Sequence, residues 1–253
     1  MLDKIIQTKQ QEVAQLPDAA ESALLLNDRD FLSIFQDFAI IAEMKAKSPS
    51  EGQIVTAYSP ADIAARYEQG GASALSVLCD HDYFGGDYAH VTQARNACAL
   101  PLLCKEFIID PKQVYTARAA GASACLLIVR VLTDAQLADL KACIERLGMT
   151  AVIEVFNQEE INRALAVSPH VLGINNRDLN SLRMDTDLSM HLKNHVPDHI
   201  YCMSFSGVKT PEDIQKRRAQ GFAGVLVGTA LMRAEDPAAF LSMQSRNVTV
   251  LAK

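Results

Sequence analysis

Eight short apolar segments alternate with segments of helical character, and this alternation predicts an α/β fold, a single (β/α)8 TIM barrel with an N-terminal helical extension. The segments start 21 to 35 residues apart, which leaves room for one strand, one helix and two loops. They are apolar on both faces, as expected for parallel strands that helices cover. The predicted strands are residues 39–45, 74–79, 101–107, 124–129, 150–155, 171–176, 200–206 and 223–228.

A weak internal repeat supports the alternation of helix and strand. In each copy a helix end is followed by a glycine and then by a strand, because glycine permits the left-handed conformation that ends a helix. The copies are YEQGGASALSVL, ARAAGASACLLI and RRAQGFAGVLVG. Three helix starts are also marked by a capping side chain ahead of a first-turn proline. These are Ser59-Pro60, Asp110-Pro111 and Thr210-Pro211.

The repeated units favour a closed barrel over an open doubly wound sheet, since no Gly-x-Gly-x-x-Gly follows the first strand. Residues 39–253 are predicted to form the barrel, which is the catalytic domain. Residues 1–38 are predicted to be a helical extension packed on it. The extension includes an amphipathic helix with Ile5, Ile6, Lys9, Val13 and Leu16 at mixed helical spacing.

The composition argues against several classes of function. The net charge is −6 and there is no basic run, so neither nucleic acid nor a membrane surface is expected as a partner. No apolar stretch is long enough to span a membrane, and the first residues lack the apolar core of a secretory signal, so we expect a cytoplasmic protein. The six cysteines form no Cys-x-x-Cys pair and are expected to be reduced, buried thiols.

Polar residues interrupt the apolar pattern where the predicted strands end. The segment IIAEMKAKSPSEG begins like a buried strand, yet Glu43, Lys45 and Lys47 follow at two-residue spacing, which predicts one shared face. In a barrel the carboxyl ends of the strands form the mouth, where catalytic groups lie. We therefore expect the mouth to gather the polar residues of five strand ends. They are Glu43, Lys45, Lys105, Glu154, Asn175, Arg177, Ser204 and Ser206.

Two carboxylates and two amines in this set form a candidate acid–base system. Burial and opposite charges shift the pKa values of such groups in competing directions. Glu43, Glu154, Lys45 and Lys105 could then move protons without a metal. The six histidines show neither a His-x-His nor a His-Glu-x-x-His spacing, so no metal site is expected.

The last two predicted strands are followed by a candidate anion site. Ser206-Gly207 comes after the seventh strand and Gly228-Thr229 after the eighth. Glycine allows backbone N–H groups to approach a phosphate, and these two loops are the usual phosphate site of such barrels. We therefore expect a small anionic substrate that carries a phosphate.

These residues resemble indole-3-glycerol-phosphate synthase, the barrel enzyme of tryptophan biosynthesis. IIAEMKAKSPSEG is similar to its first-strand signature, Glu-x-Lys-x-x-Ser-Pro-Ser, and the resemblance runs from about residue 39 to residue 241. Later blocks that resemble the family are ALSVLCDHDYFGG, PLLCKEFIIDPKQVYTARAAGASACLLI, VLGINNRDL and GVLVGTALM. The resemblance implies a decarboxylating lyase that closes the ring of 1-(2-carboxyphenylamino)-1-deoxyribulose 5-phosphate with loss of CO2 and water. It implies neither a cofactor nor a metal.

The resemblance also implies a role for each matching residue. Lys105 matches the general acid, and Glu154 matches the general base for the loss of water. Lys45 matches a second lysine that anchors the substrate, and Glu43 a carboxylate that holds the lysines and the leaving oxygen. Asn175 and Arg177 match groups that orient the substrate, and Phe84 and Phe107 match an apolar wall for its anthranilate ring. The phosphate shell is matched by Ser48, Gly207, Gly228 and Thr229, and Ser206 lines the same end.

The chain departs from the family's pattern after the seventh strand. The family usually reads Ser-Glu-Ser-Gly there, whereas this chain reads Ser204-Phe205-Ser206-Gly207 and lacks the carboxylate. Strict alternation sets Ser204 and Ser206 on one face and Phe205 on the other, so only the resemblance places Phe205 at the site. One alternative is therefore a non-catalytic or impaired phosphate-binding barrel derived from the synthase. Another is an isomerase or epimerase barrel, although such an epimerase would need metal-binding histidines at strand ends.

Overall fold

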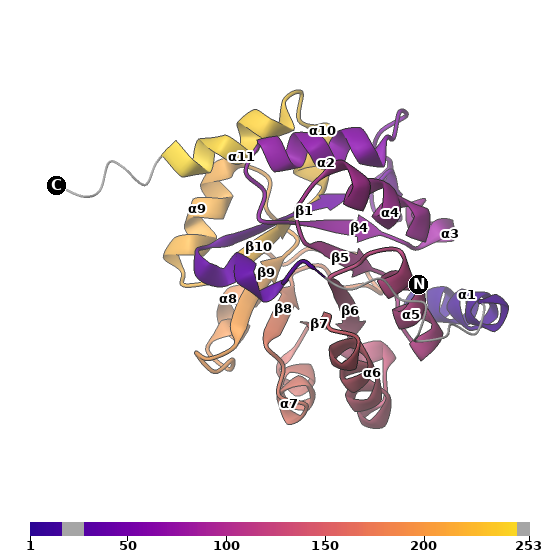
Figure 1. Ribbon diagram of the computed structural model, residues 1–253. Helices are drawn as coiled ribbons and strands as arrows, with labels where there is room; N and C mark the ends of the chain where they lie inside the picture. Colours follow the sequence, from indigo (N-terminus) through magenta and orange to yellow (C-terminus); the bar gives the residue numbers. More distant parts are fainter. Residues whose placement is uncertain (17–27, 247–253) are drawn as a thin grey trace.

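The computed structural model describes residues 1–16 and 28–246 and contains a closed barrel of parallel strands (Figure 1). Each barrel strand pairs with the next one along the chain, and the last pairs with the first. The strands are β1 (Ala39–Met44), β4 (Ala74–Leu78), β5 (Leu102–Lys105), β6 (Ala124–Ile128), β7 (Thr150–Val155), β8 (Val171–Asn175), β9 (Tyr201–Phe205) and β10 (Gly224–Val227). The predicted fold is confirmed, and every barrel strand lies within its predicted segment.

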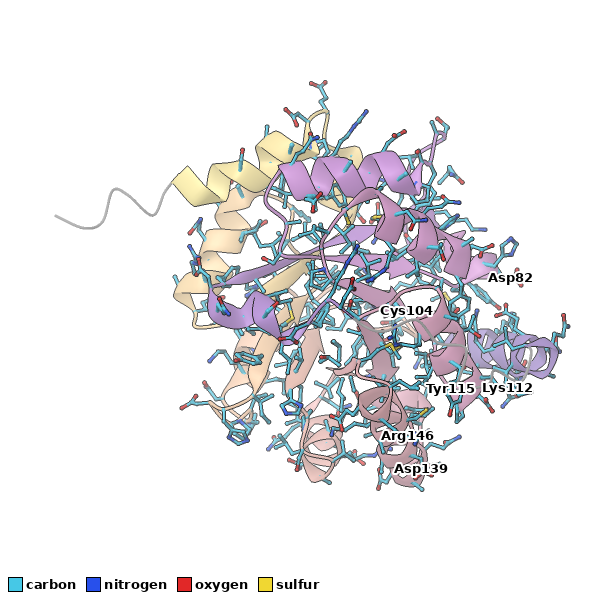
Figure 2. The ribbon with its side chains drawn as sticks, in the orientation of Figure 1. Asp82, Cys104, Lys112, Tyr115, Asp139 and Arg146 are labelled. Carbon is cyan, nitrogen blue, oxygen red and sulfur yellow. The ribbon has the colours of Figure 1, made fainter. Side chains whose placement is uncertain are left out.

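Helices connect the strands and cover the outside of the barrel (Figure 1). The longer ones are α2 (Pro60–Gln69), α4 (Tyr88–Ala97), α5 (Pro111–Ala119), α6 (Asp134–Arg146), α7 (Gln158–Ala166), α9 (Pro211–Ala219) and α11 (Pro237–Arg246). The shorter ones are η2 (Leu32–Gln36), α3 (His81–Phe84), η3 (Val129–Val131), α8 (Leu188–Lys193) and α10 (Thr229–Arg233). Figure 2 shows Tyr115 of α5 and Arg146 of α6 on neighbouring helices, where Arg146 Nη2 donates to the Tyr115 hydroxyl at 3.1 Å.

The predicted starts and ends of three helices are confirmed. The side chains of Ser59, Asp110 and Thr210 each accept a hydrogen bond from a backbone N–H in the first turn of α2, α5 and α9. A glycine with positive φ follows the last turn of the same three helices, as the repeat predicts. These are Gly71, Gly121 and Gly221, with φ of 86°, 98° and 75°.

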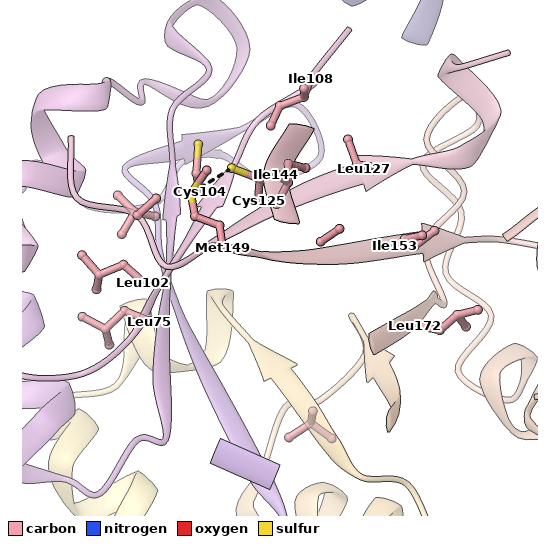
Figure 3. Close-up of a cluster of buried hydrophobic side chains, with 14 of the residues drawn as sticks. Leu75, Leu102, Cys104, Ile108, Cys125, Leu127, Ile144, Met149, Ile153 and Leu172 are labelled. Atoms are coloured by element: carbon pink, nitrogen blue, oxygen red, sulfur yellow. Dashed lines mark hydrogen bonds between the residues drawn. The ribbon is translucent and has the colours of Figure 1, made fainter. Parts of the chain in front are cut away.

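Side chains that alternate along each strand form two apolar layers. The outer layer lies between the barrel and its helices, and Figure 3 shows part of it with Leu75, Leu102, Leu127 and Ile153. The inner layer fills the barrel and includes Ile41, Leu103, Leu126, Val152 and Met203. All six cysteines are buried and free, as predicted, and Figure 3 shows Cys104 beside Cys125 in the outer layer.

Strand β1 is shorter than the polar pattern predicts. It ends at Met44, and the chain then turns into a small hairpin in which β2 (Lys47–Ser48) pairs with β3 (Gly52–Gln53). The single shared face predicted for Glu43, Lys45 and Lys47 is therefore wrong for Lys47. Its Nζ instead donates to the backbone carbonyl of Asp82 at 3.0 Å. The reason is that β1 ends at Met44 and the chain bends at Ala46, so the alternation of β1 does not continue to Lys47.

An N-terminal helix, α1 (Leu2–Gln15), precedes the barrel and lies beside α5 (Figure 1). Leu2 and Ile5 on one of its faces are buried in the inner apolar layer, and Lys9 on the same face is fully buried. The first barrel strand starts at Ala39, which is where the predicted extension ends. The division into residues 1–38 and 39–253 stays a prediction, and its residues 17–27 and 247–253 lie outside the described chain. Within the described residues no helix is long and apolar enough to cross a membrane.

Candidate active site

A cavity of about 510 Å³ opens at the carboxyl ends of the barrel strands. Every residue to which the family resemblance assigned a role lines it, although these residues come from all parts of the barrel. They are Glu43, Lys45, Ser48, Phe84, Lys105, Phe107, Glu154, Asn175, Arg177, Ser206, Gly207, Gly228 and Thr229. Their roles stay predictions, but the structure brings their side chains or backbones together around one space.

Two lysine–carboxylate pairs stand at the centre of the cavity wall. Lys45 Nζ lies 2.7 Å from Glu43 Oε1, and Lys105 Nζ lies 3.3 Å from Glu154 Oε2. Glu43 is 6% exposed and Glu154 is fully buried, so neither carboxylate could keep its charge there without a partner. The two pairs therefore place proton donors and acceptors next to each other in the lining of the cavity.

The charges of this cluster shift the pKa values of its members. Burial favours the neutral form of Glu43, but the ammonium groups of Lys45 and Lys105 outweigh it and lower the Glu43 pKa below its ordinary value. Burial likewise favours neutral Lys105, but Glu154 and Glu43 outweigh it and raise the Lys105 pKa. Before substrate binds, Lys105 therefore carries the proton that a general acid must deliver, and Glu43 is an anion.

The backbone of Gly228 makes room for the first of these pairs. A Cβ atom at position 228 would lie 2.5 Å from Glu43 Oε1 and 3.0 Å from Lys45 Nζ, so any larger residue would displace the pair. Glycine is needed here because of close approach, which its lack of a side chain allows.

Asn175 and Arg177 connect the base candidate to the loop after β8. Asn175 Nδ2 donates to Glu154 Oε1 at 3.1 Å, and its Oδ1 accepts from the Arg177 backbone N–H at 3.0 Å. The guanidinium of Arg177 in turn donates to the Leu182 carbonyl at 3.2 Å. This chain of hydrogen bonds fixes the orientation of the Glu154 carboxylate and holds Arg177 at the cavity.

The other end of the cavity has the features of an anion site. Ser48 and Thr229 line it, and the turn after β9 contributes Ser206 and Gly207, which have φ of 62° and 90°. Left-handed conformations at two successive residues are uncommon, and Ser206 adopts one at a cost of about 1–2 kcal/mol. Asn176 Nδ2 holds this turn in place by donating to the backbone carbonyls of Phe205 and Ser206 at 2.9 Å and 3.0 Å. Lys209 and Arg233 add positive charge to the same lining.

Two phenylalanines form an aromatic wall on the opposite side. The ring centroids of Phe84 and Phe107 are 6.1 Å apart, with an angle of 38° between the ring planes. Phe84 ends the short helix α3, and Asp80 caps that helix by accepting from the backbone N–H groups of Tyr83 and Phe84. Phe107 lies two residues past Lys105, just beyond the end of β5, and lines the same cavity.

Strand β9 shows the opposite orientation to the one predicted for its serines. Ser204 points away from the cavity and is fully buried, with its Oγ 3.0 Å from Ser189 Oγ and 3.1 Å from Asn176 Nδ2. The prediction that Ser204 joins the polar mouth is therefore wrong, because the inward positions of β9 are Met203 and Phe205. Ser206 reaches the cavity only because the strand has ended and the chain has turned.

Phe205 occupies the inward position instead and lines the cavity. Its ring is 1% exposed, and Lys105 Nζ lies 6.0 Å from the ring centroid. The ring also depends on Gly173 of β8, since a Cβ there would lie 2.3 Å from it. A residue that differs from the family's pattern thus lies beside the candidate general acid.

The sequence did not indicate that several other residues line the cavity. Met1 and Ile5 reach the cavity from α1, and Glu51 lies in the hairpin turn after β1. Glu51 forms ion pairs with Arg233 at 3.0 Å and with Arg177 at 3.9 Å. The amphipathic pattern of α1 indicates that one face is buried, but not that it is buried at the barrel mouth.

Comparison with known proteins matches this chain to one family. The family model described as indole-3-glycerol phosphate synthase matches residues 2–243. The chain belongs to the indole-3-glycerol phosphate synthase family. Relatives of that name are 39% identical in Polaromonas sp., covering 96% of this chain and 97% of the relative, and 41% identical in Lacticaseibacillus paracasei, covering 90% and 88%. A third, from Desulfosudis oleivorans, is 40% identical and covers 95% and 97%.

Solved structures of other enzymes share the fold. A 3-hexulose-6-phosphate synthase from Salmonella typhimurium superposes with a TM-score of 0.67 at 11% identity, covering 83% of this chain and 97% of that one. A thiamine phosphate pyrophosphorylase from Pyrococcus furiosus superposes with a TM-score of 0.62 at 15% identity, covering 86% and 97%. At such identities the likeness shows the barrel fold alone.

The position of Phe205 leads to a prediction about activity. Phe205→Glu would place a carboxylate beside the lysines, as in the family's usual Ser-Glu-Ser-Gly, and should raise kcat/KM because a better-held lysine positions the substrate more accurately. Phe205→Ala removes the ring without adding charge and should give no gain. Steady-state kinetics on both variants, with circular dichroism as the check on folding, measures this. Lower activity in a folded Phe205→Glu variant would mean that the site has repacked around the ring.

Proposed function

We propose that this chain catalyses the reaction for which its family is named. Its substrate would be 1-(2-carboxyphenylamino)-1-deoxyribulose 5-phosphate, and its products indole-3-glycerol phosphate, CO2 and water. Such an enzyme is a carboxy-lyase of tryptophan biosynthesis. The observation that carries the proposal is the pairing of Lys105 with Glu154 inside a cavity that also holds an aromatic wall and an anion end. The buried free thiols fit a cytoplasmic enzyme.

Ring closure needs an acid at the substrate carbonyl. The ring carbon that bears the carboxylate attacks the ketone carbon, the ketone oxygen takes up a proton, and CO2 leaves as the ring regains aromaticity. Lys105 is suited to supply a proton because neighbouring carboxylates keep it charged. Lys45, whose Nζ lies 2.7 Å from Glu43 Oε1, would anchor the substrate and share in proton transfer.

The second step removes the new hydroxyl as water and needs a base as well as an acid. Glu154 would accept the proton that leaves the ring carbon next to the one bearing the hydroxyl, and Asn175 orients its carboxylate through a hydrogen bond of 3.1 Å. Glu43 would hold the lysines and the leaving oxygen. Because both ion pairs are preformed, little reorganisation is required when charge develops in the transition state.

The two ends of the cavity would hold the two ends of the substrate. The Phe84 and Phe107 rings offer apolar contact to the anthranilate ring, which is best placed at an offset to them. Ser48, Ser206, Gly207, Gly228 and Thr229 line the end proposed for the phosphate. Asn175 and Arg177 would orient the chain between these ends.

A direct assay tests the proposal. Purified protein would be incubated with the carboxyphenylamino-deoxyribulose phosphate, and the fluorescence of the indole product would be followed. The chain contains no tryptophan, so protein indole emission cannot obscure the signal. Saturable formation of indole-3-glycerol phosphate is expected. Binding of the substrate without any turnover would favour the impaired barrel instead.

Loss of the candidate acid should strongly reduce turnover. Lys105→Ala is expected to lower kcat by roughly 10²–10⁴, the usual contribution of a general acid, while KM changes less. Lys47→Ala is the matched control, since it removes a lysine that bonds to the Asp82 carbonyl instead of to a site carboxylate. A kcat within a few-fold of the wild type would remove Lys105 from the proposed mechanism.

Neutralising the candidate base tests the second step. Glu154→Gln keeps the shape of the side chain and can still bond to Asn175, but it cannot accept a proton, so kcat should fall by roughly 10²–10⁴ in a folded protein. Glu159→Gln is the control, because Glu159 is an exposed residue of α7. If Glu154→Gln turns over at the normal rate, another group is the base.

An anion should occupy the phosphate end in the absence of substrate. Inorganic phosphate is expected to compete with substrate and to raise the melting temperature, since a ligand at 100 times its Kd stabilises the folded state by about 2.7 kcal/mol. Chloride at the same ionic strength controls for screening. A crystal grown in sulfate with the anion bound only elsewhere would contradict the assignment of Ser48, Gly207, Gly228 and Thr229.

A further inference from the structure

A buried cluster of charges contacts the backbone segments that carry Phe84 and Phe107. Lys9 of α1 is fully buried, and its Nζ lies 2.8 Å from Asp80 Oδ2, 3.3 Å from Glu106 Oε1 and 2.6 Å from Glu12 Oε2. Asp80 is also fully buried and Glu106 is 3% exposed. Burying a lysine is costly unless carboxylates surround it, so a cluster of this kind has to hold its members in fixed places.

Each buried carboxylate is attached to one of the two cavity phenylalanines. Asp80 Oδ1 accepts a hydrogen bond from the backbone N–H of Phe84 at 3.0 Å, whereas Lys9 Nζ lies near the other oxygen, Oδ2. Glu106 accepts the backbone N–H of Phe107 at 2.7 Å. Lys9 therefore bridges the backbone supports of Phe84 and Phe107, which come from the ends of two neighbouring strands.

The same lysine holds α1 over the cavity. Ile5 lies one helical turn before Lys9 and lines the cavity with Met1. The Thr8 and Tyr83 hydroxyls, 3.2 Å apart, make a second polar contact between α1 and α3. The charge of Lys9 also bears on Glu106: burial raises the Glu106 pKa to about 8, and Lys9 opposes this rise.

We propose that Lys9 is a positioning residue that sets the spacing of Phe84 and Phe107 by bridging Asp80 and Glu106, and so determines how tightly the site holds an aromatic ring. This inference rests on the proposed function for the identity of the ring, which is that of a 2-aminobenzoate. Lys9 touches no reacting atom, and it acts through the two backbone segments that carry the phenylalanines.

Two probes separate a positioning role from a general effect on folding. Anthranilate represents the ring end of the substrate and is followed by its own fluorescence, and inorganic phosphate represents the other end and is followed by calorimetry. Neither titration depends on catalytic turnover, so a failure of this inference is distinguishable from a failure of the proposed reaction. The variants are Lys9→Met, which keeps the length but removes the charge, and Lys4→Met as the matched control on an exposed position of the same helix.

Lys9→Met should weaken anthranilate binding by about tenfold, as expected when an aromatic contact loses its geometry, and should leave phosphate binding unchanged. Lys4→Met should change neither affinity. If Lys9→Met does not fold, Lys9→Met combined with Glu106→Gln removes both members of one charged contact and should show the same selective loss. Wild-type affinity for anthranilate in the folded variant, or a parallel loss of both affinities, would overturn the proposal. Failure of both variants to fold would also overturn it, because Lys9 would then be required for stability in general.

Discussion

Closure of the barrel is the constraint on which the rest of the structure depends. Because every barrel strand runs in the same direction, closure brings the carboxyl ends of all the barrel strands to one rim, and side chains far apart in the sequence meet there. The interior is apolar, so charges at this rim lose water and must be paired. The Glu43–Lys45 and Glu154–Lys105 pairs meet that requirement, and Gly228 provides the space for the first of them.

One short segment of the chain serves two charge clusters. At the end of β5, Lys105, Glu106 and Phe107 all reach the cavity lining, and the Glu106 carboxylate also contacts Lys9. Reactive groups and their supports are thus separated by a single peptide unit. Any shift of the segment that disturbs Glu106 also disturbs Lys105, and this coupling explains why the N-terminal helix belongs to the site although it supplies none of the proposed acids and bases.

Much of the fold and of the candidate site could be predicted from local patterns. Strands apolar on both faces, prolines after capping residues and glycines after helices each have a local cause, and a barrel then determines where strand ends meet. The predictions that failed depended on which side chains of a strand point inward, or on contacts between residues far apart in the sequence. Nothing in the sequence of β9 shows which of Ser204 and Phe205 points inward, because both are fully or almost fully buried. Nor could the place of α1 be predicted, since the partners of Lys9 lie about 70 and 100 residues away.

Phe205, compared with the glutamate of the family's usual pattern, changes the net charge of the barrel rim more than the shape of the rim. With two carboxylates against Lys45 and Lys105, the pairs are balanced, and a further carboxylate would make the cluster net negative. The proposed substrate is itself an anion at both ends, so the neutral ring removes a repulsion that would act in the bound ground state as well as in the transition state. Interactions of that uniform kind lower KM but do not raise kcat. A lysine held by fewer partners is positioned less accurately, and this cost falls on the chemical steps. The substitution should therefore lower both kcat and KM compared with relatives that retain the carboxylate, and the loss in kcat should outweigh the gain in affinity, so that kcat/KM falls.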